Sequence, residues 1–323
     1  MKTIGFVLST KENEKRRALL PQDILRIKHK KYLYFEKGYG NEIGLSDAIY
    51  QKAGANIATR EEILSKDVIC DPKIGDANYL ERLTNKTTIF GWIHAVHNKE
   101  VTNLIIEKKL TAIAWESMNR NGRHVFWRNS ELAGKAAVLD AIPHFGKLPS
   151  ECKVAIIGRG NVSEGAFMIL SNLGAKITIY NKRNEKFLRN EISNYDIIVN
   201  GILWDPLRED HIIYQQDLKR MKKPSLIIDV SCDEEGAIET SHPTTIENPI
   251  YVLDGVMHYA VDHTPSLFPY IASEIISSSV KNYIDDIIEN KIKMNKILKP
   301  AIIIEMGKIL DKQISDYKYK YAI

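Results

Sequence analysis

The stretch VAIIGRGNVSEGAFMILSNLGAKITIYNKR, Val154–Arg183, decides the fold of the second half of the chain. It starts with an apolar run, passes through a glycine turn and an amphipathic stretch, and ends in a second apolar run. This order predicts strand, turn, helix and strand, the unit from which doubly wound sheets are built. The final Asn181, Lys182 and Arg183 are unusual, because a second strand that carries a dinucleotide ribose commonly ends in an acidic residue.

The glycine turn has the spacing of a dinucleotide fingerprint. Gly158 and Gly160 would form the tight turn and the close approach to a pyrophosphate, and Ser163 is small enough for the third position. A helix that begins here presents its first N–H groups to phosphate, which adds Asn161 and Val162 to the binding residues. We therefore predict a dinucleotide site, and the alternative is a purely structural strand–turn–helix.

The basic end of the second strand indicates which dinucleotide binds. An acidic residue there would accept hydrogen bonds from the ribose hydroxyls and would repel a 2′-phosphate, whereas Lys182 and Arg183 can form charge-assisted bonds with that phosphate. The sequence thus predicts NADPH/NADP as the cofactor, held in part by Asn181, Lys182 and Arg183. The alternative is that the two cations are solvated loop residues.

Apolar and amphipathic runs alternate through the whole chain, which predicts parallel sheets covered by helices. In the first half the expected strands are TIGFVLS, YLYFEK, DVICD, TTIFGWIH and LTAIAWE, and the expected helices lie near residues 21–28, 47–53, 61–66, 78–84 and 99–108. In the second half the expected strands are KVAIIG, KITIYN, YDIIVNG, SLIIDVS and PIYVLDGV, and the expected helices lie near 163–173 and 215–221. The expected fold is α/β, with two Rossmann-like doubly wound domains and an active-site cleft between them.

Two helical stretches follow the two strand-rich halves, and the first of them connects the domains. One follows Ser130, and the other follows Pro269, where apolar residues recur at helical spacing; Pro300 would begin another short helix. We expect the helical tail to pack back on the first domain. The expected division is a substrate domain, residues 1–129 with 274–323, and an NADP-binding domain, residues 130–273.

Composition narrows the class of protein. The chain has 323 residues, 44% hydrophobic and 27% charged, which is typical of a globular protein of two domains. Its net charge of +4 is too small to indicate nucleic-acid binding, and no apolar stretch is long enough for a membrane span. Three cysteines without CxxC spacing and the absence of a signal-like start predict reduced thiols and a cytoplasmic location. No metal-ligand pattern is evident.

Polar side chains follow several strands of the first half. Arg16 and Arg17 lie in EKRRALLP, Lys73 in CDPKIGD and His94 in IFGWIHAVH. Ligands bind doubly wound sheets at the carboxyl ends of the strands, where an Arg, a Lys and a His could hold an anion and move a proton. From these residues alone the pattern is only suggestive, because a His after an apolar strand is more often a packed or capping residue.

A set of motifs in fixed order extends over nearly the whole chain: RRALLP, DPK, IHAVH, SELAGK, the glycine turn, IDVSCDEEGAIETSHPTT and HYAVDHTPSLFP. In this set the chain resembles the superfamily of alanine dehydrogenase, pyridine nucleotide transhydrogenase and lysine-forming saccharopine dehydrogenase. DHTPSLFP is closer to the saccharopine dehydrogenase version, and the CDEEGAIETS segment is closer to the alanine dehydrogenase version. Together with the basic ribose strand, the resemblance implies an opine-forming, NADP-dependent oxidoreductase.

The resemblance also implies roles for individual residues. Arg16 matches the arginine that binds the substrate carboxylate, Lys73 the lysine that contacts the keto acid, and His94 the acid/base. Asp233 matches an aspartate near the nicotinamide. Asp229 and Ser231 would line the cofactor cleft. Alanine dehydrogenases place their lysine before an E-P pair, whereas Lys73 follows Asp71-Pro72, so the role of Lys73 is less closely matched.

Several residues keep more than one interpretation. Arg17 could replace Arg16 as the inward arginine, and Glu116 could cap a strand end rather than bind a ligand. Asp262 and His263 could shape a turn before Pro265 or lie at the nicotinamide.

The implied reaction is the NADPH-dependent reductive condensation of pyruvate with the side-chain amine of ornithine or lysine, in a homo-oligomer (tetramer or dimer). The alternatives are an alanine dehydrogenase using ammonia, a saccharopine-type enzyme using 2-oxoglutarate and lysine, and a non-catalytic NADP(H)-binding sensor.

Overall fold

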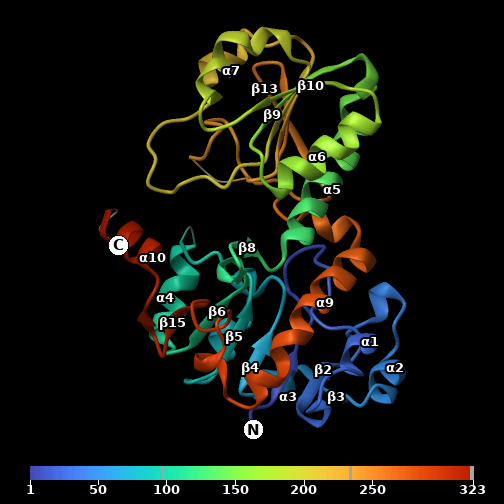
Figure 1. Ribbon diagram of the computed structural model, residues 1–323, viewed down its shortest axis with the longest axis vertical. Coiled ribbons are helices and arrows are strands. Elements are labelled where there is room, and N and C mark those ends of the chain that lie inside the picture. The colour runs from blue at the N-terminus through green and yellow to red at the C-terminus, as the bar shows by residue number, and fades with distance from the viewer. Residues whose placement is uncertain (97, 233–234, 321–323) are drawn as a thin grey trace. The chain divides into compact units, whose positions relative to one another are not determined.

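The computed structural model describes residues 1–96, 98–232 and 235–320, which fold into two compact units (Figure 1). The first unit comprises Met1–Phe126 and Pro269–Ile323, and the second comprises Trp127–Phe268. The boundaries fall at the first residues of two long helices, α5 (Trp127–Phe145) and α9 (Pro269–Ile288). They lie a few residues before the positions that the sequence suggested.

The first unit is built on an eight-stranded sheet with the order β16-β15-β6-β5-β4-β1-β2-β3. The strands are β1 (Ile4–Phe6), β2 (Leu33–Glu36), β3 (Asn56–Ala58), β4 (Val68–Cys70), β5 (Thr88–Gly91), β6 (Thr111–Ala114), β15 (Ile302–Glu305) and β16 (Lys308–Ile309). Strands β1 to β6 are parallel, and the chain first builds outward from β1 to β3 and then returns to add β4 beside β1. The carboxyl ends of β1 and β4 therefore lie at a topological switch point, where sheets of this kind bind ligands.

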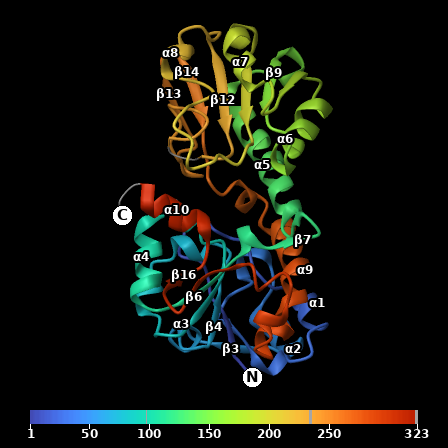
Figure 2. The ribbon, with the colours of Figure 1, turned by 60° about the vertical axis from the view of Figure 1, so that its left-hand side comes forward.

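Helices cover both faces of this sheet (Figure 2). They are α1 (Pro21–Ile24), α2 (Asp47–Lys52), α3 (Arg60–Leu64), α4 (Lys99–Glu107), α9 and α10 (Lys312–Lys320). The inner side of α9 buries Ile276, Val280 and Ile284 against strand residues such as Phe6 and Phe35, so the helical tail does pack on the first unit as expected. Among the helices of the described residues, none is both long and apolar enough to cross a membrane.

The second unit has a six-stranded sheet with the order β10-β9-β11-β12-β14-β13. Its strands are β9 (Lys153–Ile157), β10 (Lys176–Tyr180), β11 (Ile197–Asn200), β12 (Ser225–Asp229), β13 (Ile250–Leu253) and β14 (Val256–Tyr259). Helices α5 and α6 (Asn161–Asn172) cover one face, and α7 (Glu185–Glu191) and α8 (Gln215–Leu218) cover the other. The predicted fold class, with two doubly wound α/β units and mainly parallel sheets, is confirmed.

Three local predictions were wrong. PIYVLDGV is not one strand but the start of an antiparallel hairpin, β13–β14, because Asp254 and Gly255 both take positive φ and form a tight turn. Pro300 does not begin a helix, since the run Ile302–Glu305, which starts with three β-branched isoleucines, adds strand β15 antiparallel to β6. The stretch 78–84 contains only a short 3₁₀ turn, Leu80–Arg82.

Candidate active site

The candidate substrate site lies at the carboxyl edge of the first unit's sheet. Strands β1, β4, β5 and β6 are neighbours there, and their parallel direction brings the loops that follow them to one edge. These four loops carry Arg16, Lys73, His94 and Glu116. The sequence singled out the first three from their positions after strands, and the strand order now explains why they share an edge.

Arg16 is buried, with only 4% of its surface exposed, and two neighbouring side chains fix its orientation. Its Nε donates to Glu14 Oε1 at 2.8 Å, and its Nη2 lies 2.5 Å from Glu14 Oε2. The guanidinium carbon also lies 5.0 Å from the centroid of the Trp92 ring, which belongs to the loop after β5. The pair with Glu14 uses Nε and one side of Nη2, so the Nη1 end of the fork lies outside this ion pair.

Arg17 points to a different environment. Its Nε donates to the carbonyl oxygen of Tyr39, its Nη1 donates to the Arg16 carbonyl at 3.0 Å, and its guanidinium stacks near the Tyr39 ring. These contacts tie the loop after β1 to the first unit's core. The geometry therefore favours Arg16 as the arginine that faces the site.

Lys73 follows β4 and is 5% exposed. Its Nζ lies 3.1 Å from Asp76 Oδ2, and Lys11, from the loop after β1, lies 3.6 Å from the other oxygen of the same carboxylate. The backbone N–H of Lys73 donates to Asp71 Oδ1 at 2.9 Å. Asp71 thus fixes the backbone of the loop, and Asp76 fixes the side chain of Lys73. Lys73, Asp76 and Lys11 form a compact group of alternating charges at the β1–β4 switch point.

Asp71 is fully buried beneath this group. The hydroxyl of Tyr79 donates to its Oδ2 at 2.7 Å, in addition to the bond from Lys73 N–H. Burial raises the pKa of Asp71 to about 6, with a further upward contribution from the Glu14 carboxylate, while the bonds from Tyr79 and Lys73 act in the opposite direction. The carboxyl group can therefore change protonation state close to neutral pH.

The loops after β4 and β5 touch without side chains between them. Gly75 N–H donates to the Trp92 carbonyl at 3.0 Å, and a Cβ at Gly75 would lie only 2.1 Å from the Ile93 carbonyl oxygen. Only glycine fits at this contact, which holds the Lys73 loop against the His94 loop. The glycine of DPKIGD therefore has a packing role that the sequence did not reveal.

His94 is exposed, and its backbone is in the left-handed region with φ of 53°. Glu116 holds this conformation, because its carboxylate accepts the His94 N–H at 2.7 Å and the Ile93 N–H at 3.2 and 3.3 Å. Positive φ is costly for a residue with a Cβ, and two bonds to one carboxylate offset that cost. The sequence left the role of Glu116 open, and the structure shows it as the acceptor at this strand end.

The glycine turn of the second unit is formed as its sequence predicts, with β9 before it and α6 after it. Gly158 has φ of +111°, and a Cβ at this position would lie 2.6 Å from Ser163 Oγ. Ser163 is 2% exposed, and its Oγ lies 3.2 Å from the Ile157 carbonyl and 3.3 Å from that of Gly201, so it can donate to either. Its small side chain therefore joins α6 to the ends of β9 and β11.

Gly160 differs from the other glycines of the turn. Its φ of −81° suits any residue, and no protein atom lies within 4 Å of the position of its Cβ. Within the described part of the chain, no acceptor pairs with the N–H groups of Asn161, Val162 or Ser163. The turn thus offers open space and N–H donors together, which fits the pyrophosphate of a dinucleotide.

Asn181, Lys182 and Arg183 follow β10 directly. Lys182 and Arg183 are exposed, and neither forms an ion pair with a described residue. Arg183 N–H donates to Asn181 Oδ1 at 2.9 Å, and Asn181 N–H donates to Asn184 Oδ1 at 2.7 Å. The segment is therefore a hydrogen-bonded turn that presents two cations to solvent.

The polar residues at the end of β12 have partners within the unit. The buried Asp229 accepts from Asn200 Nδ2 at 2.9 Å and from the N–H groups of Ser231 and Cys232 at 3.2 Å each, and burial raises its pKa. Ser231 Oγ donates to the Ile202 carbonyl. These bonds join the loops after β11 and β12, and contact of Asp229 or Ser231 with a cofactor stays a prediction. Asp233 lies outside the described residues.

Asp262 and His263 open the 3₁₀ turn Thr264–Leu267. Asp262 Oδ1 lies 2.5 Å from His263 Nδ1, and His263 is 2% exposed. Thr264 Oγ1 donates to the Ala133 carbonyl of α5 at 3.0 Å. These contacts favour the turn-shaping interpretation of the pair.

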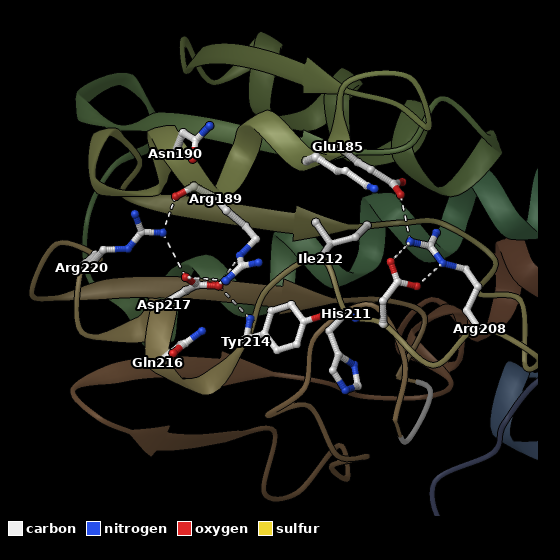
Figure 3. A pocket seen from close by; sticks show the side chains of 12 residues that line it. Glu185, Arg189, Asn190, Arg208, His211, Ile212, Tyr214, Gln216, Asp217 and Arg220 are labelled. Carbon is white, nitrogen blue, oxygen red and sulfur yellow. Dashed lines mark hydrogen bonds and ion pairs between the residues drawn. The ribbon is translucent and has the colours of Figure 1, made fainter.

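A pocket of about 750 Å³ lies between α7, residues 208–212 and α8 (Figure 3). Most of its charged side chains are paired: Arg189 and Arg220 both bind Asp217, and Arg208 binds Glu185 at 3.0 Å and Asp210 at 2.8 Å. The sequence analysis did not indicate this pocket. Among the described residues no cluster of three or more His, Cys, Asp or Glu side chains could hold a metal.

Fold and site together define an oxidoreductase of the nicotinamide-dependent α/β class, and comparisons with known proteins identify its family. Residues 8–133 match the model of the alanine dehydrogenase/PNT N-terminal domain, and residues 181–312 match that of the C-terminal domain. The chain belongs to the alanine dehydrogenase/PNT family, and the predicted superfamily and enzyme class are confirmed.

Among its relatives, the chain is 33% identical over 298 residues to N(5)-(carboxyethyl)ornithine synthase of Clostridium botulinum, covering 87% of this chain and 93% of the relative. The enzyme of the same name from Lactococcus lactis is 32% identical over 85% of this chain and 92% of its own length. Alanine dehydrogenase 1 of Staphylococcus aureus is 24% identical over 98% of both chains. A solved L-alanine dehydrogenase shares the fold with a TM-score of 0.82 at 20% identity, over 98% of this chain and 99% of its own.

Proposed function

We propose that this enzyme condenses pyruvate with the side-chain amine of ornithine or lysine and reduces the product with NADPH, which with ornithine gives N5-(carboxyethyl)ornithine. The observation that carries the proposal is the group formed by Arg16, Lys73 and His94 at neighbouring strand ends. The similarity to two enzymes named N(5)-(carboxyethyl)ornithine synthase supports the choice of reaction.

The proposed roles follow from the geometry. The Nη1 end of Arg16 binds the pyruvate carboxylate, since Glu14 occupies the opposite side of the guanidinium. Lys73, paired with Asp76, donates to the keto oxygen and polarises the carbonyl carbon for attack by the amine. Because Glu14 and Asp76 offset the two cations, the site also tolerates the positive charge of a basic amino acid.

His94 is the proposed acid. As imidazolium it protonates the hydroxyl of the carbinolamine, which leaves as water to give an imine, and histidine is the side chain that most often performs such a proton transfer. Gly158, Gly160 and the first N–H groups of α6 would hold the cofactor pyrophosphate in the second unit, and Lys182 and Arg183 would bind its 2′-phosphate. When bound, NADPH supplies the hydride that reduces the imine carbon.

The decisive assay follows NADPH oxidation with pyruvate plus ornithine, lysine or ammonia, and with 2-oxoglutarate plus lysine, and identifies products by mass spectrometry. We expect turnover with pyruvate and ornithine or lysine. If ammonia is the only amine that supports turnover with pyruvate, the result would instead favour alanine dehydrogenase. This is the second candidate function, because the similarity to the Staphylococcus aureus relative covers 98% of both chains. Assembly as a homo-oligomer, a tetramer or a dimer, also stays a proposal, and light scattering tests it.

The role of His94 has its own test. We expect His94→Ala to lower kcat by about 10²- to 10⁴-fold, because it removes the proton donor, and to leave NADPH binding intact. Calorimetric titration with NADPH provides the control. Near-normal turnover of the variant would exclude His94 as the acid.

A further inference from the structure

The pocket between α7 and α8 is lined by polar and charged side chains, with Ile212 as an aliphatic exception (Figure 3). Its volume of about 750 Å³ falls within the range of roughly 300–1,000 Å³ that small-molecule sites have. Its described lining residues all belong to the second unit, and none of them lies in the glycine turn at residues 158–163. The pocket therefore suits a polar small molecule that is bound apart from the cofactor pyrophosphate.

A buried carboxylate organises one end of the pocket. Asp217 is 3% exposed and accepts the Tyr214 N–H at 3.0 Å. Arg189 Nε donates to its Oδ2 at 2.9 Å, and Arg220 Nη2 donates to its Oδ1 at 3.0 Å. The side chains of these two arginines, called here the arginine pair, are 37% and 49% exposed and line the pocket. One buried acid thus fixes two cations that remain accessible to a ligand.

Further contacts hold the arginine pair in place. The guanidinium carbon of Arg189 lies 4.5 Å from the centroid of the Tyr214 ring, and Arg220 Nη2 also donates to the Arg189 carbonyl. Within the described residues, no acceptor is bound to Arg189 Nη1 or to the Nε and Nη1 of Arg220. The pair therefore offers several charge-assisted donors in fixed positions, which lowers the entropy cost of binding an oxyanion.

The other end of the pocket is electrically balanced. Arg208 binds Glu185 at 3.0 Å and Asp210 at 2.8 Å. This guanidinium and, to a smaller extent, the ammonium group of Lys186 lower the pKa of Asp210. Two cations thus offset two carboxylates at this end, whereas the arginine pair shares a single carboxylate. The excess positive charge of the pocket therefore lies at the arginine pair.

We infer that the pocket is a second ligand site, at which the arginine pair binds the oxyanion of a small polar metabolite, either a phosphate or a carboxylate. The exposed amides of Asn190 and Gln216 line the same pocket and can bind other polar groups of the ligand. The site does not depend on the proposed reaction, because its residues are separate from the groups assigned to substrate and cofactor. Since Arg189 belongs to α7 and Arg220 follows α8, a bound ligand joins these two elements.

Calorimetric titration of the enzyme with inorganic phosphate and, separately, with citrate tests the site and distinguishes a phosphate from a carboxylate ligand. Each titration is made with saturating NADPH or NADH, whichever the wild type prefers, so that the cofactor site is already occupied. Arg220→Ala removes one guanidinium group, and Arg189→Lys keeps the charge but loses the planar fork. We expect wild type to bind at least one of the two anions, and each variant to bind it at least about tenfold more weakly.

Lys219→Ala is the matched control, because it removes an exposed cation next to Arg220 that does not line the pocket. This control should bind as the wild type does. Asp217 keeps the Tyr214 N–H and a cationic partner in both arginine variants, so we expect both to fold, and melting temperatures check this. If Arg220→Ala unfolds, Arg189→Lys decides alone.

Three outcomes would each overturn the inference. The first is that wild type binds neither anion, and the second is that the arginine variants bind as tightly as wild type. The third is binding that appears only without the dinucleotide, which would assign the anion to the cofactor site.

Discussion

Two glycines five positions apart illustrate how a single residue can serve either a ligand or the fold. Gly160 precedes α6 in open space, whereas a Cβ at Gly165 would lie 1.9 Å from the Glu131 carbonyl oxygen of α5. Gly134 of α5 has the same relation to the Val162 carbonyl of α6, again at 1.9 Å. The fold itself therefore requires glycine at 165 and 134 but not at 160, in keeping with the proposed role of Gly160 in cofactor binding.

This difference yields a paired prediction. Gly160→Ala should change the free energy of unfolding by less than about 1 kcal/mol, the range of changes at a helix N-cap. It should weaken NADPH binding on the order of tenfold by crowding the pyrophosphate. Gly165→Ala should destabilise the fold by about 1–3 kcal/mol, because the two helices must move apart. Urea unfolding and NADPH titration of both variants measure the two effects, and tight NADPH binding by Gly160→Ala would contradict the assignment.

Asp71 gives a prediction about pH. Its folded pKa of about 6 lies above the ordinary value of 3.8, so the folded state binds the proton more tightly than the unfolded state. The stabilisation is complete below the ordinary pKa and is lost as pH rises through the folded pKa. Between pH of about 4 and 7 the wild type should lose on the order of 2–3 kcal/mol through this group, and Asp71→Asn should not.

Urea unfolding of wild type and Asp71→Asn at several pH values measures this difference. Asp210→Asn serves as a contrast, because Arg208 lowers the pKa of Asp210, and its contribution is lost as pH falls rather than as it rises. Parallel stability curves for wild type and Asp71→Asn would show that Asp71 does not titrate in this range.

At the scale of elements, Glu116 links the loop that follows β6 to the loop that follows β5. The carboxylate, which follows β6, holds two N–H groups after β5, so one strand end sets the backbone at the other. Glu116→Ala should lower kcat by about 10- to 100-fold by releasing His94 from its left-handed conformation, with a loss of about 1–3 kcal/mol of stability. Glu116→Gln keeps one acceptor oxygen and should fall between wild type and the Ala variant.

Steady-state kinetics and thermal unfolding of these variants test the coupling. Glu107→Ala, at an exposed position at the end of α4, is the matched control and should behave as the wild type. Full activity of Glu116→Ala would show that the backbone of His94 needs no such support.

The success of sequence-based prediction varied from element to element for physical reasons. Apolar runs bounded by turn residues identified β1, β2, β4, β5 and β6, and Arg16, Lys73 and His94 follow such runs. Their positions alone were only suggestive, and the resemblance to a known superfamily was needed to propose their roles. Glu116 was left open and Gly75 was not assigned a role, because each acts through a contact with a loop that follows another strand. Glu14 was missed although its partner, Arg16, lies only two residues away. The Asp254-Gly255 signal of the β13–β14 hairpin was present in the sequence and was overlooked.

At the scale of the whole molecule, the proposed substrate site and the proposed cofactor site lie on different units of the chain. The first unit is completed only when α9 and β15 return to it after the second unit, and its carboxyl edge carries Arg16, Lys73 and His94, the proposed keto-acid site. The second unit contains the glycine turn and the basic turn after β10. The alternation of apolar and amphipathic runs in the sequence predicted the two units. It did not predict that β15 pairs with β6, because that pairing joins strands far apart along the chain.

This division predicts separate footprints in hydrogen exchange. NADPH should slow exchange at residues 158–165 and 181–186 of the second unit, because the phosphates occupy their N–H groups and order the turns. Pyruvate should slow exchange at residues 9–17, 71–76 and 92–95 of the first unit. Mass spectrometry of peptides from the enzyme with each ligand alone measures both footprints, and Arg16→Ala serves as the control that should lose only the pyruvate footprint. A pyruvate footprint confined to the second unit would contradict the placement of the keto acid at the β1–β4 edge.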